Sequence, residues 1–437
     1  MAKATKREAS YEAGFRAGYE RGQQAGRTDF YFPFEGTSII IPTYNQKEMV
    51  LSCLESIEAH TRLPYEIIVV DDASTDGTLQ ALSSRKIRVA VHARNAGFAA
   101  SVNTGLMMAK GSTVVLLNND ILVTPRWLDN MLHCLHSGTD IGAVGPVTNY
   151  IGGEQQIDVP YREVRDMWTF AAAYNAGDPG KWRETDRLVG FCLLMDRKFA
   201  EQTGYLDEGF RTGNFEDDDW GLRVRVQGRR LMIAGDAFIH HFGSVTMKSL
   251  AAAQFQQINE DNRSYFAQKW GEPAKLLQKL GVNLNSPCPP RPYQDFYPTH
   301  VLLKSSSGCL YWLEDGRRYR VSDIPPKAKQ AGKAVRVSQR DLSKMPLQGE
   351  KSWRQLPFMK ERQEASGLDE LQEGDVIALS QEEVCQVYGG QLRPFVTPWA
   401  AMAWGFQAKE VQNPKVLTAY SHGLPLLAPN RILAEDL

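Results

Sequence analysis

A short apolar run that stops on three polar residues constrains the fold of this chain more than any other feature. Residues 113–117 read Thr-Val-Val-Leu-Leu and lead directly into Asn118, Asn119 and Asp120. An apolar run without alternation predicts a strand covered on both faces, as in a parallel sheet. Because ligands of such sheets bind beyond the carboxyl ends of the strands, we expect these polar side chains at the mouth of a site.

The polar triplet has two interpretations. A carboxylate beside amide oxygens suits a hard divalent cation that also holds a diphosphate. Asn and Asp are also common turn residues, so a plain exit from the strand into a turn is the alternative. The order of the neighbouring elements favours the site.

Apolar strands and helices alternate along this part of the chain. Strands are expected at residues 38–42, 66–70, 87–92 and 113–117, with helical spacing over 50–57 and a helix over 99–108. This βαβαβαβ order predicts an α/β fold with a parallel sheet. The first, second and fourth strands all end in polar residues, which should therefore cluster along one edge of the sheet.

The densest run of carboxylates follows further along, at Glu216, Asp217, Asp218 and Asp219. It leads into a predicted helix over residues 222–227. Strands are expected over 190–195 and 231–234, and the adjacent His240 and His241 come after the second of these. A helical segment over 254–270 is expected to close this domain.

Length, charge and cysteine usage exclude several classes of protein. A chain of 437 residues predicts two or three domains. A net charge of −1 argues against general electrostatic binding of nucleic acid or anionic lipid. No apolar run reaches the ~20 residues of a membrane span, and the polar N-terminus does not read as a signal peptide. The six cysteines include no CxxC pair, which is typical of reduced thiols in a cytoplasm.

Four segments are expected. Residues 1–36 form a helix-compatible leader whose glycines recur every fourth residue, which suits either a packing or homodimer contact or an arm without a partner. Residues 37–275 form the α/β domain, and the proline-rich residues 276–298 read as a linker. Residues 299–437 read as a tandem β-rich module, with repeats at about 299–350 and 376–430, because two hairpin patterns around glycine turns recur there.

The ordered motifs resemble the family-2 glycosyltransferases of the GT-A fold, over residues ~37–270. The fold class implied is GT-A, a Rossmann-like mixed α/β sheet, here followed by the small β-rich domain. The motifs that carry the resemblance are Ile40-Ile41-Pro42-Thr43-Tyr44-Asn45, Val69-Val70-Asp71-Asp72-Ala73-Ser74-Thr75-Asp76-Gly77, Arg94-Asn95-Ala96-Gly97, Leu116-Leu117-Asn118-Asn119-Asp120, Phe215-Glu216-Asp217-Asp218-Asp219 and His240-His241-Phe242-Gly243.

The resemblance implies a site for the nucleotide of a nucleotide-diphosphate sugar. Thr43 and Tyr44 would flank the base, within the motif Pro42 to Asn45. Asp72 would accept a hydrogen bond from the base, and Asp71 would help to set the loop. Arg94 or Asn95 would contact the nucleotide. Asn118 and Asn119 stand where the family's DXD motif has its first positions.

The resemblance also implies a divalent metal, Mn²⁺ or Mg²⁺, that bridges the diphosphate. Asp120 is the only carboxylate of the triplet and would hold it. His240 or His241 resembles the family's later histidine on the metal side, and the sequence does not choose between them. The two asparagines leave the site less negative than a DXD motif, so metal affinity is expected to be modest.

The acidic run resembles the family's ED motif, which supplies the catalytic base. Asp217 is the residue expected to deprotonate the acceptor hydroxyl in an inverting transfer, with Asp218 as the alternative and Glu216 beside them. A base within hydrogen-bond reach contributes ~10²–10⁴-fold to a rate. Asp219 and Arg223, one turn apart, are expected to form a structural pair. Trp168, Trp182 and Trp220 are candidates for stacking on a sugar or for core positions.

Other activities remain as alternatives. A nucleotidylyltransferase would carry a glycine-rich basic loop early in the chain, where this chain has Pro-Thr-Tyr-Asn, and a dehydrogenase would need G-x-G-x-x-G after the first strand. A non-catalytic protein that binds a carbohydrate or nucleotide sugar is a third class. The tandem module suggests an acceptor in a cell-envelope glycan or glycoprotein of a bacterial surface. We expect a cytoplasmic protein, including the inner face of the membrane as a peripheral location.

Overall fold

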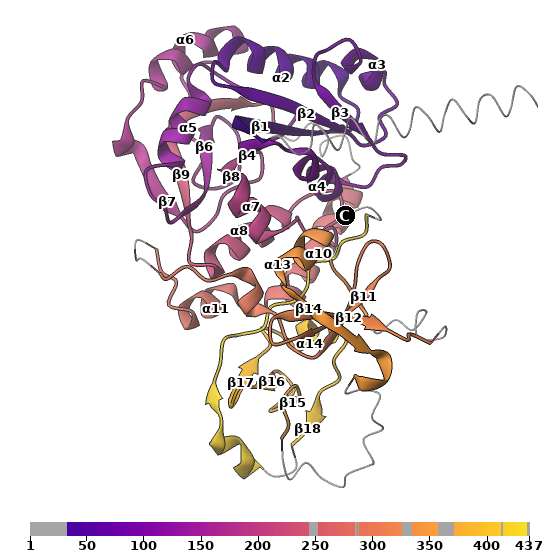
Figure 1. Ribbon diagram of the computed structural model, residues 1–437. Coiled ribbons are helices and arrows are strands. Elements are labelled where there is room, and N and C mark those ends of the chain that lie inside the picture. Colours follow the sequence, from indigo (N-terminus) through magenta and orange to yellow (C-terminus); the bar gives the residue numbers. More distant parts are fainter. Residues whose placement is uncertain are drawn as a thin grey trace, which may run out of the picture.

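The computed structural model describes residues 33–243, 252–284, 286, 288–325, 334–356, 371–411 and 414–434. An α/β domain occupies the upper half of Figure 1, and two small β-sheets lie below it in orange and yellow. The leader over residues 1–32, with its glycine stripe and the expected dimer contact, lies outside the described residues. No helix in the described ranges has the length and apolar character that a membrane crossing requires.

The α/β domain is built on one sheet, with order β3-β2-β1-β4-β8-β6-β9-β5 and β7 paired to β9. Its strands are β1 (Phe34–Thr43), β2 (Tyr65–Asp71), β3 (Arg88–Val91), β4 (Gly111–Leu117), β5 (Ile121–Leu122), β6 (Ile141–Thr148), β7 (Trp182–Thr185), β8 (Cys192–Asp196) and β9 (Arg230–His241). Its helices are α2 (Lys47–His60), α3 (Thr78–Leu82), α4 (Phe98–Met108), α5 (Trp127–Leu135), α6 (Val164–Tyr174), α7 (Arg197–Thr203), α8 (Glu216–Val226) and α10 (Ala252–Trp270), with the 3-10 turn η1 at Pro179–Lys181.

The first four strands are parallel, as the sequence predicts, but the whole sheet is mixed. β1 pairs in parallel with both β2 and β4. β8 is antiparallel to β4 and separates it from β6. As a result the loop before β8 lies at the carboxyl end of β4. There the backbone N–H of Asn118 donates to the backbone carbonyl of Phe191 at 2.9 Å.

Apolar side chains alternate between the two faces of the sheet. Ile40 packs in one cluster with Val102 and Leu106 of α4 and Val224 of α8. Ile39 and Ile41 pack in the other, with side chains of α2 and α5. Because both faces are covered, the central strands read as continuous apolar runs rather than as alternating ones.

Two elements differ from the expected bounds in a way that matters for the site. α8 begins at Glu216, so the acidic run forms its first turn instead of preceding the helix. β9 continues to His241, well beyond the expected end at residue 234. The two histidines are therefore consecutive strand residues and must point to opposite faces.

The C-terminal part forms two five-stranded sheets with the same strand arrangement. Each has a three-stranded meander with a parallel strand added at either edge, in the orders β13-β10-β11-β12-β14 and β18-β15-β16-β17-β19. The elements are β10 (Val301–Lys304), β11 (Leu310–Glu314), β12 (Arg317–Ser322), β13 (Val335–Arg336), α13 (Gln339–Lys344), β14 (Leu347–Ser352), η3 (Trp353–Gln355), β15 (Val376–Ala378), β16 (Val384–Tyr388), β17 (Gln391–Pro394), α14 (Pro398–Ala403), β18 (Lys409–Glu410), η5 (Pro414–Ala419) and β19 (Ser421–His422).

The segment read as a linker is packed rather than extended. It contains the end of α11 (Pro273–Lys279) and the 3-10 turn η2 (Tyr293–Phe296). Tyr293 and Phe296 are buried in a third cluster, together with Leu222 of α8 and apolar residues of both repeats. The α/β domain and the repeats therefore share a continuous apolar interface.

Candidate functional site

The polar strand ends meet around one cavity of about 230 Å³. It lies at the carboxyl ends of β1, β2 and β4, where an α/β sheet binds its ligands. The loop before β8 and the start of α8 also contribute to its wall. Its lining includes Pro42, Thr43, Tyr44, Asp72, Asn95, Asn118, Asn119, Asp120, Gly190, Phe191, Glu216, Asp217 and His241.

The wall at the end of β1 is fixed by its own hydrogen bonds. The Asn119 amide donates to the Thr43 hydroxyl at 2.9 Å, which ties the ends of β4 and β1 together. Tyr44 remains 39% exposed at the cavity rim, where a base could stack on it. Asn45 instead braces the next loop, because its side-chain oxygen accepts from the Thr75 amide at 2.8 Å. Asn45 does not line the cavity.

Asp72 makes more hydrogen bonds within the protein than the sequence suggests. Its carboxylate accepts from the amides of Ala96 and Gly97 at 2.8 and 2.9 Å. It also lies 2.8 Å from the Nδ1 atom of His92. Asp72 therefore holds the loop before α4 in place and lines the cavity at the same time.

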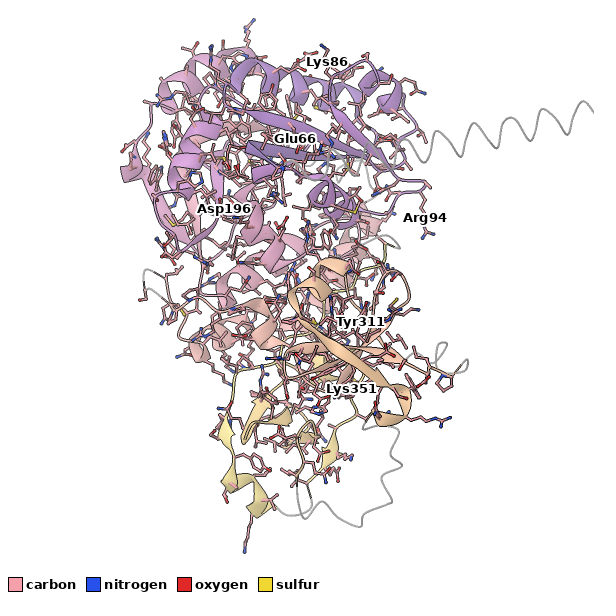
Figure 2. The ribbon with its side chains drawn as sticks, in the orientation of Figure 1. Glu66, Lys86, Arg94, Asp196, Tyr311 and Lys351 are labelled. Atoms are coloured by element: carbon pink, nitrogen blue, oxygen red, sulfur yellow. The ribbon has the colours of Figure 1, made fainter. Side chains whose placement is uncertain are left out.

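The other two candidates on this side lie apart from the cavity lining. Asp71 is buried and accepts from the Ser74 amide at 3.3 Å, which fits its expected role in setting the loop. Arg94 is exposed, and Figure 2 shows it pointing away from the body of the domain. Asn95 is the member of the Arg94–Asn95 pair that lines the cavity.

Asp120 and His241 lie together at the cavity, and we call this the metal side because the motifs predict a metal there. The Nε2 atom of His241 lies 3.4 Å from the Oδ2 atom of Asp120, and both side chains are buried. The other ring nitrogen, Nδ1, is 2.7 Å from the Tyr150 carbonyl, so it must carry the proton of that bond. In a neutral ring, Nε2 would carry the lone pair, and this buried nitrogen beside the Asp120 carboxylate has no hydrogen-bond partner among the described residues. Phe191 stacks on the ring at 5.5 Å and keeps its orientation.

This arrangement fits a divalent cation. A backbone carbonyl that fixes the tautomer of an imidazole is the usual support behind a metal-binding histidine. A neutral His241 would supply one nitrogen ligand to such a cation, and Asp120 would supply one oxygen ligand. No cluster of three or more His, Cys, Asp or Glu side chains is found among the described residues, so a diphosphate and water would complete the coordination.

His240 faces the other way. Its Nδ1 atom lies 2.8 Å from the Tyr161 hydroxyl, and its ring packs at 4.9 Å against Phe242. Burial, with His241 nearby, lowers the pKa of His240 to about 4, so it is neutral at physiological pH. Of the two histidines that the sequence left open, His241 lines the cavity and His240 does not.

Glu216 and Asp217 reach the cavity from the first turn of α8. The Oδ2 atom of Asp217 accepts from the Gly190 amide at 2.8 Å. Burial raises the pKa of Asp217 to about 6, with a contribution from Asp218, against opposing hydrogen bonds and Arg187. Burial raises the pKa of Glu216 further, with Asp217 adding to it, and its Oε2 atom is buried without a partner. Asp217 is thus the carboxylate that ionises near neutral pH.

The next two carboxylates of the run face elsewhere. Asp218 forms an ion pair with Arg187 at 2.5 Å and does not line the cavity. Asp219 pairs with Arg223 at 3.1 Å, as the spacing predicts, and neither side chain is exposed. The order of the four carboxylates is therefore two toward the cavity, one toward solvent and one toward the core.

The tryptophan candidates are not in the cavity wall. Trp220 is a core residue at 2% exposure, and the Trp182 indole donates to Asp236. Trp168 packs against the core cluster beneath the sheet. The sequence analysis also missed the loop over 212–214, which lines the cavity with three successive residues at positive φ. Its Gly213-Asn214 pair was the available signal, since both residues tolerate that region.

Comparison with known proteins finds relatives of the α/β domain. The sequence profile described as Glycosyl transferase family 2 matches residues 38–204. An uncharacterized glycosyltransferase of Bacillus subtilis, YwdF, is 26% identical over 207 residues, which are 47% of this chain and 74% of that protein. Chondroitin synthase of Pasteurella multocida is 26% identical over 47% of this chain and 24% of its own length.

Other relatives are longer than the matched region. The uncharacterized protein y4gI of Sinorhizobium fredii is 30% identical over 49% of this chain, and the chain spans 26% of its length. The chain thus spans about a quarter of several curated relatives. Among solved structures, a mannosyltransferase of Pyrobaculum calidifontis with GDP-Man and Mn²⁺ is 22% identical, with a TM-score of 0.37, over 52% of this chain and 65% of that one.

The mixed sheet and the matched region agree with the GT-A fold class that the motifs predict. Residues 38–204 match the model of glycosyl transferase family 2. The match covers the strands that carry Thr43, Asp72 and Asp120 and the loop that carries Gly190.

Proposed function

We propose that this chain transfers a sugar from a nucleotide-diphosphate sugar to a hydroxyl of an acceptor, with inversion at the anomeric carbon. The observation that carries the proposal is the pairing of two sites in one cavity. Asp120 and His241 line it, and so does Asp217. Such a transfer needs a cation at the leaving diphosphate and a separate base at the acceptor hydroxyl.

The donor would lie across the ends of β1, β2 and β4. Tyr44 would stack on the base, and Asn95 with the loop before α4 would contact the nucleotide. Asp120 and His241 would hold Mn²⁺ or Mg²⁺, which neutralises the charge that develops on the diphosphate. The backbone bond from His241 Nδ1 to Tyr150 keeps Nε2 directed toward Asp120.

Asp217 would act as the general base. The acceptor oxygen forms its bond to the anomeric carbon while its proton passes to a carboxylate oxygen of Asp217. The bond between the anomeric carbon and the diphosphate oxygen breaks, and its electron pair stays on the diphosphate. A pKa of about 6 suits this role, because the group is ionised at neutral pH yet remains a better base than an exposed aspartate.

The acceptor would approach from the side of α8. Asp217 also lines a second cavity of about 380 Å³, together with Asp218, Arg187, Leu222 and Phe266. A base shared by two cavities can face a donor in one and an acceptor from the other. We propose a cell-envelope glycan or glycoprotein as the acceptor class, and the cytoplasm or the inner face of the membrane as the place of the reaction.

The test is nucleotide release from a panel of UDP-, dTDP- and GDP-sugars, with Mn²⁺, with Mg²⁺ and with chelator. Metal-dependent release from one donor would support the proposal and identify the sugar. An Asp217→Asn variant should bind that donor and lose release. Absence of release and of any donor-induced thermal shift across the panel would contradict the proposal and favour a non-catalytic binding protein.

A further inference from the structure

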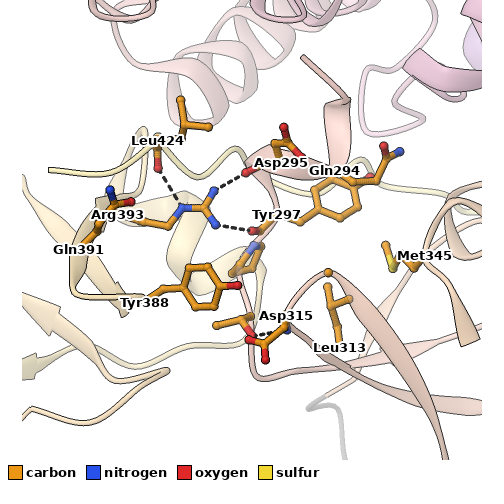
Figure 3. A pocket seen from close by; sticks show the side chains of 13 residues that line it. Gln294, Asp295, Tyr297, Leu313, Asp315, Met345, Tyr388, Gln391, Arg393 and Leu424 are labelled. Carbon is orange, nitrogen blue, oxygen red and sulfur yellow. Dashed lines mark hydrogen bonds between the residues drawn. The ribbon is translucent and has the colours of Figure 1, made fainter. Parts of the chain in front are cut away.

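A separate cleft, distinct from both cavities described above, lies at the junction of the two C-terminal sheets. Its volume is about 310 Å³, near the lower end of the ~300–1,000 Å³ typical of small-molecule sites. Figure 3 shows it from close by, with side chains entering from the segment around η2 and from both repeats. None of its lining residues also lines the cavity of the α/β domain.

Corresponding hairpin turns of the two repeats form its walls. In the first repeat, Asp315 and Gly316 make the turn between β11 and β12, both with positive φ. In the second, Gly389 and Gly390 make the same turn between β16 and β17. Such two-residue turns give a fixed strand register. Tyr388 and Gln391, which flank the second turn as a cross-strand pair, therefore enter the cleft together.

The repeats differ at this pair. By strand register, Glu314 and Arg317 of the first repeat stand where the second has Tyr388 and Gln391. Glu314 forms an ion pair with Lys351 and does not line the cleft. The second repeat thus has an aromatic ring and an amide, both lining the cleft, where the first repeat has a charged pair that does not line it.

Arg393 holds the floor of the cleft. Its guanidinium donates to the backbone carbonyls of Leu424 and Tyr297, at 3.1 and 3.3 Å, and to that of Asp295. All three acceptors belong to residues that line the cleft, as Figure 3 shows. The geometry is therefore fixed by a buried side chain before any ligand arrives, and preorganisation lowers the cost of binding.

The remaining polar groups are arranged for a neutral ligand rich in hydroxyls. Asp295 and Asp315 are acceptors and outnumber the one cation, Arg393, so the lining does not favour an anion. The exposed side chain of Gln391 supplies both a donor and an acceptor.

Apolar surface completes this chemistry. Tyr388 is half-buried, and Leu313, Met345 and Leu424 lie around the same cleft. A saccharide combines hydroxyls that both donate and accept with C–H faces that pack on aromatic rings. We propose that this cleft binds a neutral saccharide, about one or two sugar residues of a glycan, independently of the α/β domain.

Only the role that we assign to the saccharide site rests on the proposed function; the binding itself does not. If the chain is a glycosyltransferase, the bound saccharide is part of the acceptor polymer, and the cleft keeps the acceptor on the enzyme between transfers. Effective concentration then lowers the apparent KM for polymeric acceptors without any change at the catalytic cavity. Short acceptors that cannot span both sites would gain nothing.

The experiment measures saccharide binding to the full chain by saturation-transfer NMR, without metal or nucleotide. The probes are methyl glycosides of glucose, galactose, mannose, N-acetylglucosamine and N-acetylgalactosamine, with their β-linked disaccharides. The test variants are Tyr388→Ala and Gln391→Ala. The matched controls are Tyr311→Ala and Gln348→Ala, which alter the same residue types in the first repeat outside the cleft. Circular dichroism establishes that each variant is folded.

We expect binding of at least one probe, weakened tenfold or more by Tyr388→Ala and by Gln391→Ala and unchanged by the controls. No binding by any probe, or binding equally affected in test and control variants, would overturn the inference. Nucleotide release, measured in parallel, separates the two proposals. Nucleotide release without saccharide binding would support the proposed transferase activity and contradict the proposed saccharide site. Saccharide binding that depends on the cleft, without nucleotide release, would support the saccharide site and contradict the transferase activity.

Discussion

Lys269 of α10 and Asp219 of α8 form an ion pair of 2.6 Å, with 1% and 0% of their side chains exposed. The same ammonium lies 2.6 Å from Asp207 and donates to the Asn430 side chain at 2.8 Å. Burial raises the pKa of Asp219, but Lys269 and Arg223 outweigh it and hold the value below its ordinary range. The helix that carries Asp217 is therefore fixed through a buried charge network that reaches the C-terminal segment.

Lys269→Met should strongly destabilise the protein. It leaves two buried carboxylates without their shared cation, and breaking a buried pair in this way costs about 3–5 kcal/mol. Urea unfolding measures the loss. Lys275→Met is the matched control, because its pair with Glu272 is exposed and such pairs contribute about 0–1 kcal/mol. Equal effects of the two substitutions would contradict the structural role of Lys269.

The neighbouring histidines provide a test of the metal side. His241→Gln should lower Mn²⁺ affinity at least tenfold, because it removes the nitrogen that faces Asp120. His240→Phe should leave it unchanged, since His240 packs against Tyr161 and Phe242. Calorimetric titration with Mn²⁺ in the presence of UDP, and again with GDP, distinguishes the two. The reverse order of effects would assign the metal side to His240.

Asp217 should set the acidic limb of the pH profile. The folded protein holds the Asp217 proton up to a pKa of about 6, above the ordinary 3.8. If Asp217 is the base, kcat/KM should rise as pH increases through about 6 and level off above it. In Asp217→Asn this limb should disappear and the rate should fall by ~10²–10⁴-fold. A limb that persists in the variant would assign the base to another group.

The same pKa shift predicts the effect on stability. A raised pKa in the folded state means that Asp217 favours folding at low pH, and that this contribution is lost as pH rises from about 3.8 to about 6. At pH 8 the ionised, buried group is unfavourable. Asp217→Asn should therefore be at least as stable as the parent at pH 8 in thermal unfolding, so its loss of activity would not reflect loss of the fold.

The strand ends were predictable because burial and chemistry coincide there. Residues 113–117 had to be a covered strand, and parallel pairing with β1 brings Asn119 to Thr43. The assignment of the histidines was not predictable, because it depends on the length and register of β9. That strand runs on to His241 through its pairing with β6 and β5, which involves residues far apart in the sequence.

Interactions between distant segments explain the other differences. The sequence indicates that Asp72 binds a nucleotide base. In the structure its carboxylate accepts two hydrogen bonds from backbone amides that lie 24 and 25 positions further along the chain. Nothing in the local pattern around Asp72 indicates that partner. The three tryptophans likewise have no pattern that separates stacking on a ligand from packing in a core. Such choices are made by tertiary contacts rather than by local sequence.

The last segment of the chain returns to the α/β domain and should contribute to its stability. Ile432, at 4% exposure, is buried in the same apolar cluster as Ile40 and Leu116. The amides of Leu433 and Ala434 donate to the Glu208 carboxylate, at 2.5 and 2.8 Å. Glu208 also accepts from Asn103 of α4, the helix that begins beside the nucleotide side of the cavity.

Ile432→Ala should lower the free energy of unfolding by about 2–5 kcal/mol, as expected when a buried aliphatic side chain is truncated. Leu433→Ala is the matched control, because the adjacent Leu433 is 68% exposed and should change stability by less than about 0.5 kcal/mol. Urea unfolding followed by tryptophan fluorescence measures both. A single transition shifted only by Ile432→Ala would mean that the C-terminal segment folds as part of the α/β domain. An unshifted midpoint for Ile432→Ala would mean that the segment does not stabilise that domain.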